Sequence, residues 1–123
     1  MKIGLSHTSI VTVTEANTAL TIGSGDMDIF ATPALAALME NAAMKAVAES
    51  LPEGNTTVGA KLDINHLKPS AIGETISATA LLAEVDGKKL TFTLKAENSH
   101  GLIIGEGIHI RYIVEKEKFL SKL

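Results

Sequence analysis

The spacing of hydrophobic residues changes near residue 55, and the change separates a helix from a set of strands. Before that point, residues 32–51 carry leucine, methionine and alanine at helical spacing, with Thr32 expected as the N-cap and Pro33 as the first helical residue. Pro52 and Gly54 should end this helix after about five turns. We therefore predict one long helix in the chain.

Strand-like alternation lies on both sides of this helix. Residues 7–20 are rich in Thr, Val and Ile and predict a strand that is exposed on one face. After the helix, turn residues rather than linkers separate four runs with a period of two, and the Asp86-Gly87 pair indicates a tight hairpin. The final residues, 115–123, alternate in charge and predict a solvated extension or a short helix. The four runs cover about residues 56–67, 74–85, 89–98 and 102–114.

This order of elements predicts an α+β domain with a five-stranded antiparallel sheet wrapped around the long helix. The many alanines of the helix would let strands approach closely, so we expect the sheet to curl around it and bury it. With 123 residues, of which 46 % are hydrophobic, the chain is long enough for one packed domain, residues 1–123, but not for two.

Composition excludes several classes of function. The absence of cysteine removes disulfides and thiolate chemistry, and we expect a cytoplasmic location with no signal peptide and no membrane span. A net charge of −3, one tyrosine and three phenylalanines argue against a nucleic-acid partner. The four histidines show no ligand spacing, so neither a metal nor another cofactor is predicted.

A lone glutamate lies among the apolar residues of the predicted helix. On a helical projection Glu40 falls beside Ala36, Met44 and Val47, and no side chain three or four residues away can pair with it. A carboxylate in that position either reaches solvent at the rim of the sheet or needs a partner on the sheet if it is buried.

The strand after the helix offers that partner. Val58, Ala60, Leu62 and Ile64 form an apolar row, and His66 continues it. We expect Glu40 to meet His66 and to fix its tautomer, although a hydrogen-bonded structural histidine is the simpler interpretation of His66 alone.

Thr32 completes a possible site at the start of the helix. Free N–H groups there can hold an oxyanion, and the hydroxyl can attack or orient a water molecule. Capping alone would equally explain a threonine before Pro33.

These segments carry a family likeness. The sequences FATPALAALMENAA and LPEGNTTVGAKLDINHLKPSAIGETISATALL resemble the hotdog-fold thioesterases of the fluoroacetyl-CoA thioesterase-like group, over about residues 24–114. The residues that match the family's catalytic pattern are Thr32, Glu40 and His66, and those that match its substrate-binding positions are Phe30, Gly59 and Arg111.

The resemblance implies a hotdog homodimer, or a dimer of dimers, with its site at the subunit interface. Its substrate would be a small or medium acyl-CoA, hydrolysed to a free acid and CoA. Thr32 would be the nucleophile or hold the attacking water, with His66 as general base and Glu40 assisting it. Fluoroacetyl-specific members of the family carry an aromatic-rich lid just ahead of the helix, whereas GSGDMDI has no aromatic residue before Phe30, so selectivity for fluoroacetyl-CoA is not expected.

Two other functions fit the same fold. A non-catalytic hotdog module would bind acyl-CoA or a protein partner, with Thr32 acting only as a helix cap. An enoyl-CoA hydratase is less favoured because no Asp and His lie close together in the sequence as the motif of that group requires.

Overall fold

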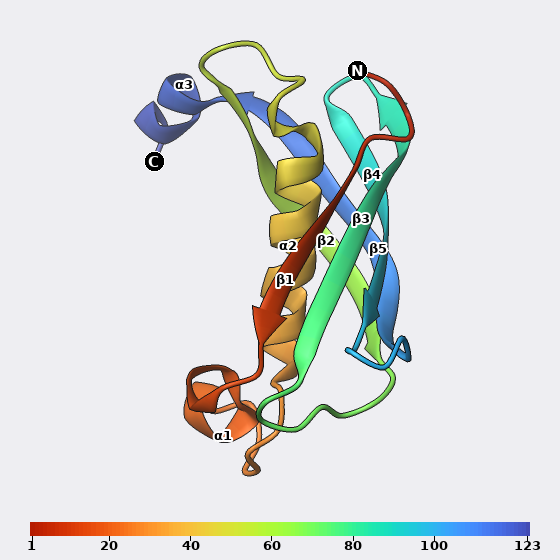
Figure 1. The fold of residues 1–123 in the computed structure, drawn as a ribbon. Coiled ribbons are helices and arrows are strands. Elements are labelled where there is room, and N and C mark those ends of the chain that lie inside the picture. Colours follow the sequence, from red (N-terminus) through yellow and green to blue (C-terminus); the bar gives the residue numbers. More distant parts are fainter.

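The computed structural model describes residues 1–123, and its five strands form one antiparallel sheet in the order β1-β3-β4-β5-β2. Figure 1 shows the sheet curving around the long helix α2, Thr32–Ala48, with β1 crossing in front of it and β2 behind it. Helix α2 contacts all five strands. The predicted α+β architecture is therefore confirmed. The strands are β1 (Ser6–Thr12), β2 (Asn55–His66), β3 (Thr75–Asp86), β4 (Lys89–Glu97) and β5 (Ile103–Glu115).

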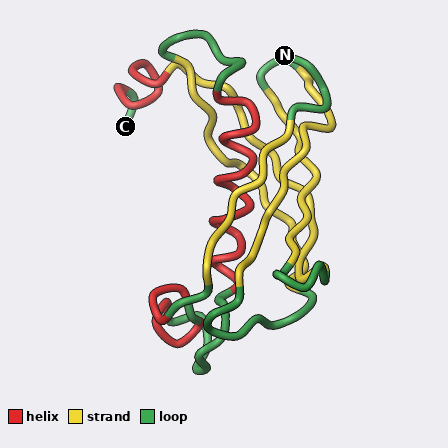
Figure 2. The backbone as a smooth tube through the Cα atoms, viewed as in Figure 1, coloured by secondary structure: helices red, strands yellow, loops and turns green.

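Three short helical segments flank this core (Figure 2): η1 at Glu15–Asn17, α1 at Ala19–Ile22 and α3 at Lys116–Ser121. The predicted strand at residues 7–20 ends at Thr12, so the prediction is wrong for residues 13–20. The Asn17 side chain accepts a hydrogen bond from the Thr14 backbone N–H at 2.9 Å, which turns the chain into η1 instead. At the other end of the chain, residues 115–123 were predicted to be a solvated extension or a short helix, and they contain the short helix α3.

The core lies between one face of α2 and the inner face of the sheet. Leu35, Met39 and Val47 of the helix are fully buried, and Phe92 and Leu90 of β4 meet them from the sheet. The helix ends at Ala48, slightly before the predicted position. No helix has both the length and the apolar character that crossing a bilayer requires.

A β-bulge changes the register of β2. Gly59 pairs with Arg111 and Lys61 pairs with Ile110, so Ala60 is the extra residue. After the bulge, Leu62, Ile64 and His66 lie on the helix side of the sheet, as predicted; before it, Thr57 and Gly59 take that side. The prediction that Val58 and Ala60 belong to the inner row is therefore wrong, because one inserted residue inverts the alternation.

Candidate active site

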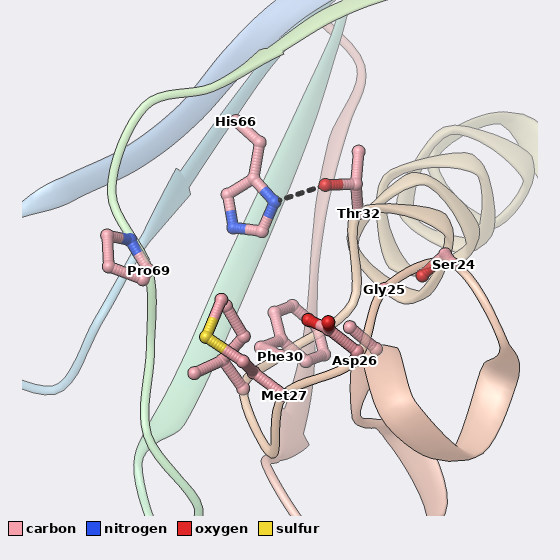
Figure 3. A pocket seen from close by; sticks show the side chains of 10 residues that line it. Ser24, Gly25, Asp26, Met27, Phe30, Thr32, His66 and Pro69 are labelled. Atoms are coloured by element: carbon pink, nitrogen blue, oxygen red, sulfur yellow. Dashed lines mark hydrogen bonds between the residues drawn. The ribbon is translucent and has the colours of Figure 1, made fainter.

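The start of α2 and the end of β2 bring a threonine and a histidine together. The Thr32 Oγ1 atom lies 2.8 Å from His66 Nδ1, as Figure 3 shows. The predicted capping role of Thr32 is wrong, because the N-cap is Ala31 and Thr32 is already the first helical residue, followed by Pro33. The Thr32 hydroxyl is consequently free to bond the imidazole.

His66 lies in a surrounding that favours the neutral imidazole. Its ring packs edge-on against Phe30, with ring centroids 6.4 Å apart and an angle of 80° between the planes. Burial lowers the pKa of His66, and a backbone interaction with Lys68 only partly offsets this effect. A neutral imidazole can accept a proton, so His66 is able to act as a base near neutral pH.

The two nitrogens of His66 have different partners. If the Thr32 hydroxyl donates to Nδ1, the single ring proton of the neutral imidazole is on Nε2. The Nε2 atom is buried on the other side of the ring, and no group of the chain, the Lys68 backbone included, makes a hydrogen bond of acceptable geometry with it (Figure 3). An unpaired buried N–H costs free energy, so this atom marks a place where an acceptor is missing.

A pocket of about 320 Å³ opens beside this pair. Such a volume is at the small end of the range for small-molecule sites in proteins. Its wall on one side is the loop ahead of α2, in which Met27, Ile29 and Phe30 are the large side chains (Figure 3 labels Met27 and Phe30). The lining residues are Ala19, Ser24, Gly25, Asp26, Met27, Ile29, Phe30, Thr32, His66 and Pro69.

Glu40 does not meet His66 within one chain. It is about 12 Å further along α2 than Thr32, at 1.5 Å per residue. Its carboxylate oxygen Oε2 lies 3.8 Å from Arg111 Nη1 and 3.9 Å from His109 Nε2, and the side chain is 42 % exposed. The expectation that Glu40 reaches the sheet is right, but its neighbours there are on β5 and not at the end of β2.

Glu40, Thr57, His109 and Arg111 form a second cluster, in which Arg111 is held rigidly. Its Nε donates to Thr57 Oγ1 at 2.8 Å, its Nη2 donates to the Thr57 carbonyl at 3.0 Å, and its Nη1 lies 3.1 Å from His109 Nε2. Burial lowers the pKa of Arg111, and the charge of Glu40 partly offsets this effect. Gly59 leaves the room for the cluster, since a Cβ there would lie 2.8 Å from Glu40 Oε2.

Sequence reasoning missed His109 and Thr57. The inner row of β5 contains Gly105, Gly107, His109 and Arg111, where a core-facing strand would ordinarily carry apolar residues. Polar side chains in a buried row were the available signal for a second cluster. The chain has no group of three or more His, Cys, Asp or Glu side chains that could hold a metal ion.

Comparison with known proteins identifies the family of the chain. The family model described as FlK, fluoroacetyl-CoA-specific thioesterase, matches residues 13–117. The fluoroacetyl-CoA thioesterase of Streptantibioticus cattleyicolor is 32 % identical over 96 residues, which cover 78 % of this chain and 68 % of that protein.

Solved structures show the same fold. A structure of the fluoroacetyl-CoA thioesterase FlK superimposes with a TM-score of 0.90 at 28 % identity, covering 99 % of this chain and 94 % of the other. A thioesterase superfamily member from Thermus thermophilus has a TM-score of 0.91 at 24 % identity, over 98 % and 89 % of the two chains. The hotdog architecture is thus confirmed, and the chain belongs to the fluoroacetyl-CoA-specific thioesterase family of thioester hydrolases.

Proposed function

We propose that Thr32 and His66 carry out the hydrolysis of a small or medium acyl-CoA, the reaction class of the family. The observation that carries this proposal is the 2.8 Å contact between Thr32 Oγ1 and His66 Nδ1 beside a pocket. A hydroxyl bonded to a neutral imidazole is the arrangement that activates an alcohol for attack on an acyl carbon.

The reaction follows from this contact in two steps. His66 Nδ1 takes the Thr32 proton as Oγ1 attacks the thioester carbonyl, the C–S bond breaks, and the CoA sulfur leaves with that proton. Water then attacks the acyl–Thr32 ester as His66 Nδ1 takes its proton; the acyl C–Oγ1 bond breaks, and that proton returns to Thr32 Oγ1, which releases the free acid and restores the pair. The direct bond to the imidazole favours Thr32 as nucleophile over Thr32 as a holder of water.

The first turn of α2 provides donors for the carbonyl oxygen. The backbone N–H groups of Thr32 and Ala34 have no acceptor among the backbone hydrogen bonds of the chain. Such groups at a helix N-terminus stabilise the negative charge that develops on an attacked carbonyl. Phe30 forms the adjoining wall and orients the His66 ring, which is the substrate-binding role we propose for it.

The acyl group that fits is limited by the loop wall. In the part of the pocket ahead of α2, the large side chains are Met27, Ile29 and Phe30, and Phe30 is the one aromatic ring. A volume of about 320 Å³ suits a short to medium acyl group rather than a long chain. Since the loop lacks further aromatic residues, we do not propose selectivity for the fluorinated substrate.

We further propose that the site is completed in a homodimer. The His66 Nε2 atom needs an acceptor, and Glu40 has a partly exposed carboxylate with no hydrogen bond in its own chain. Strand β2 lies at the edge of the sheet, and an unpaired edge is a natural place for a second copy.

Pairing of two β2 strands about a two-fold axis would bring these groups together. Antiparallel pairing sets the end of one strand, at His66, against the earlier part of the other, at Gly59, where an added Cβ would meet the Glu40 carboxylate. Glu40 of the second copy would then accept from His66 Nε2, and Gly59 and Arg111 would approach the substrate from that side. In this arrangement Glu40 and His66 are far apart within one chain, but they act in the same site because each site takes its Glu40 from the other copy.

Mixed dimers test the shared site. We expect His66→Ala and Glu40→Ala chains, each nearly inactive, to regain about a quarter of the wild-type rate after unfolding and refolding together, because half the dimers are mixed and carry one intact site. Each variant refolded alone is the control. A monomer mass by light scattering at micromolar concentration, or no recovery in the mixture, would contradict the shared site.

A panel of acyl-CoA substrates tests the activity itself. We expect CoA release, followed with a free-thiol reagent, to be faster with acetyl- to hexanoyl-CoA than with palmitoyl-CoA. Calorimetric binding without release of CoA from any of them would instead indicate a non-catalytic module. That alternative is weakened by the structure, because its motive was a capping role for Thr32 and the cap is Ala31.

A further inference from the structure

We propose that His109 is a positioning residue, a neutral imidazole with its proton on Nδ1 that holds Arg111 in place beside Glu40. The proposal concerns the second cluster and its role in the reaction rests on the function proposed above. Three observations carry it. Each ring nitrogen of His109 has one contact, and three side chains converge on the space beside Gly59.

The tautomer follows from the partners of the ring. His109 Nδ1 lies 2.7 Å from the Lys61 carbonyl oxygen, which can only accept, so Nδ1 carries a proton. His109 Nε2 lies 3.1 Å from Arg111 Nη1, which can only donate, so Nε2 presents its lone pair. Only the neutral, Nδ1-protonated imidazole satisfies both contacts.

The surroundings also oppose a charged ring. His109 is 1 % exposed, and Phe92 of β4 covers it with ring centroids 6.3 Å apart. Burial is the largest influence and lowers the pKa of His109; the hydrogen bond to the Lys61 carbonyl raises it, the charge of Arg111 lowers it and that of Glu40 raises it, with a net lowering. Protonation of Nε2 would set an imidazolium against a guanidinium and break the contact between them.

The bulge in β2 provides the acceptor for His109. Ala60 is the inserted residue, and the carbonyl that His109 bonds belongs to the next residue, Lys61. A bulge disrupts the ladder locally, so a carbonyl there is available to a side chain. The ring of His109 therefore joins the bulge of β2 to the guanidinium on its own strand.

Arg111 has a fixed direction as a result. Each of its three nitrogens makes one of the contacts with Thr57 and His109, and these fix the plane of the guanidinium. In that plane Nη1 stays 3.8 Å from Glu40 Oε2, close enough for attraction but beyond hydrogen-bond distance. Glu40 thus keeps a carboxylate that another group can use.

Gly59 shows that the three side chains converge. A Cβ at this position would lie 2.8 Å from Glu40 Oε2 and 3.3 Å from both Arg111 Nη1 and His109 Cε1. Only a residue without a side chain leaves this space free. The cluster is therefore packed as one unit, in which a loss of the His109 contacts would displace Arg111 and Glu40 together.

Nitrogen NMR of the imidazole rings tests the tautomer without reference to activity. The chain has four histidines, and the spectrum of His109→Gln assigns the signals of His109 by their disappearance. We expect His109 to show the Nδ1-protonated neutral form at pH 7. The Nε2-protonated form, or an imidazolium at that pH, would overturn the proposal even if the enzyme hydrolyses thioesters.

Kinetics of paired variants test the positioning role. His109→Phe keeps the ring but loses both hydrogen bonds, whereas the amide of His109→Gln can still donate and accept. We expect kcat to fall by about tenfold to a hundredfold in the Phe variant and by less than about threefold in the Gln variant. His7→Phe, on β1, is the matched control and should keep the wild-type rate.

Two results would contradict this role. A loss in the Gln variant as large as that in the Phe variant would show that a donor and an acceptor at this position do not preserve the rate. An unimpaired Phe variant would show that Arg111 and Glu40 need no support from His109. Melting temperatures of both variants, measured beside the rates, separate a loss of folded protein from a loss of turnover in the folded enzyme.

Discussion

Replacement of His66 by alanine is expected to lower kcat for CoA release by about 10²- to 10⁴-fold, the range for loss of a general base. The imidazole is the one group in hydrogen-bond contact with the Thr32 hydroxyl, so without it the hydroxyl has no proton acceptor. Thiol release from the preferred acyl-CoA, with the folded state checked by circular dichroism, measures the effect.

An exposed histidine provides the matched control for this substitution. His100 lies in the turn before β5, and His100→Ala should keep the wild-type rate. A His66→Ala enzyme with more than about a tenth of the wild-type kcat would be inconsistent with a general base.

The pH profile of the wild type offers a second check on His66. A base must be neutral to act, so activity is present above the pKa of His66 and is lost as the pH falls through it. Burial lowers that pKa from its ordinary value of 6.5, and the Glu40 carboxylate proposed beside Nε2 in the dimer raises it, so the acid limb of kcat/KM should move to lower pH in Glu40→Gln. An acid limb at the same pH in the two enzymes would contradict the contact between Glu40 and His66.

Substitution of Gly107 by alanine is expected to lower the free energy of unfolding by about 3 kcal/mol and the melting temperature by about 10 °C. A Cβ at this position of β5 would overlap the Asp63 carbonyl oxygen and lie 2.8 Å from the Ile64 Cα atom, both in the backbone of β2. Backbone atoms cannot move aside as a side chain does, so the two strands would have to separate.

The neighbouring glycine of the same strand is a control for this prediction. A Cβ at Gly105 would lie 2.9 Å from Leu35 Cδ2, which belongs to a side chain that can change rotamer. Gly105→Ala should therefore cost about 1 kcal/mol. If thermal unfolding showed Gly107→Ala to be no less stable than Gly105→Ala, the close approach of β2 and β5 would not be the cause.

The fold was predictable because its signals are local. The helical spacing in α2 and the alternation in the four later strands each appear within one segment, and turn residues such as Asp86-Gly87 set the hairpin order. The bulge at Ala60 was not predictable, since one inserted residue in a strand leaves the sequence looking like regular alternation.

The site was predictable only in part, for a related reason. Thr32 and His66 lie at the ends of elements whose faces could be read from periodicity, and the structure brings them together. The neighbours of Glu40 depend on which strand passes over the middle of the helix, and that is decided by tertiary packing. His109 and Arg111 belong to a row of glycines and polar residues, a pattern typical of a solvent-facing side, yet both side chains are buried.

The most direct test of the central claim is a double-mutant cycle on Thr32 and His66, with kcat measured for Thr32→Val, His66→Ala and the combined variant. Because the two groups act through one hydrogen bond, we predict that the double variant is no slower than His66→Ala within about threefold. Losses that multiply in the double variant would show that Thr32 and His66 act independently, and would contradict the proposed catalytic pair.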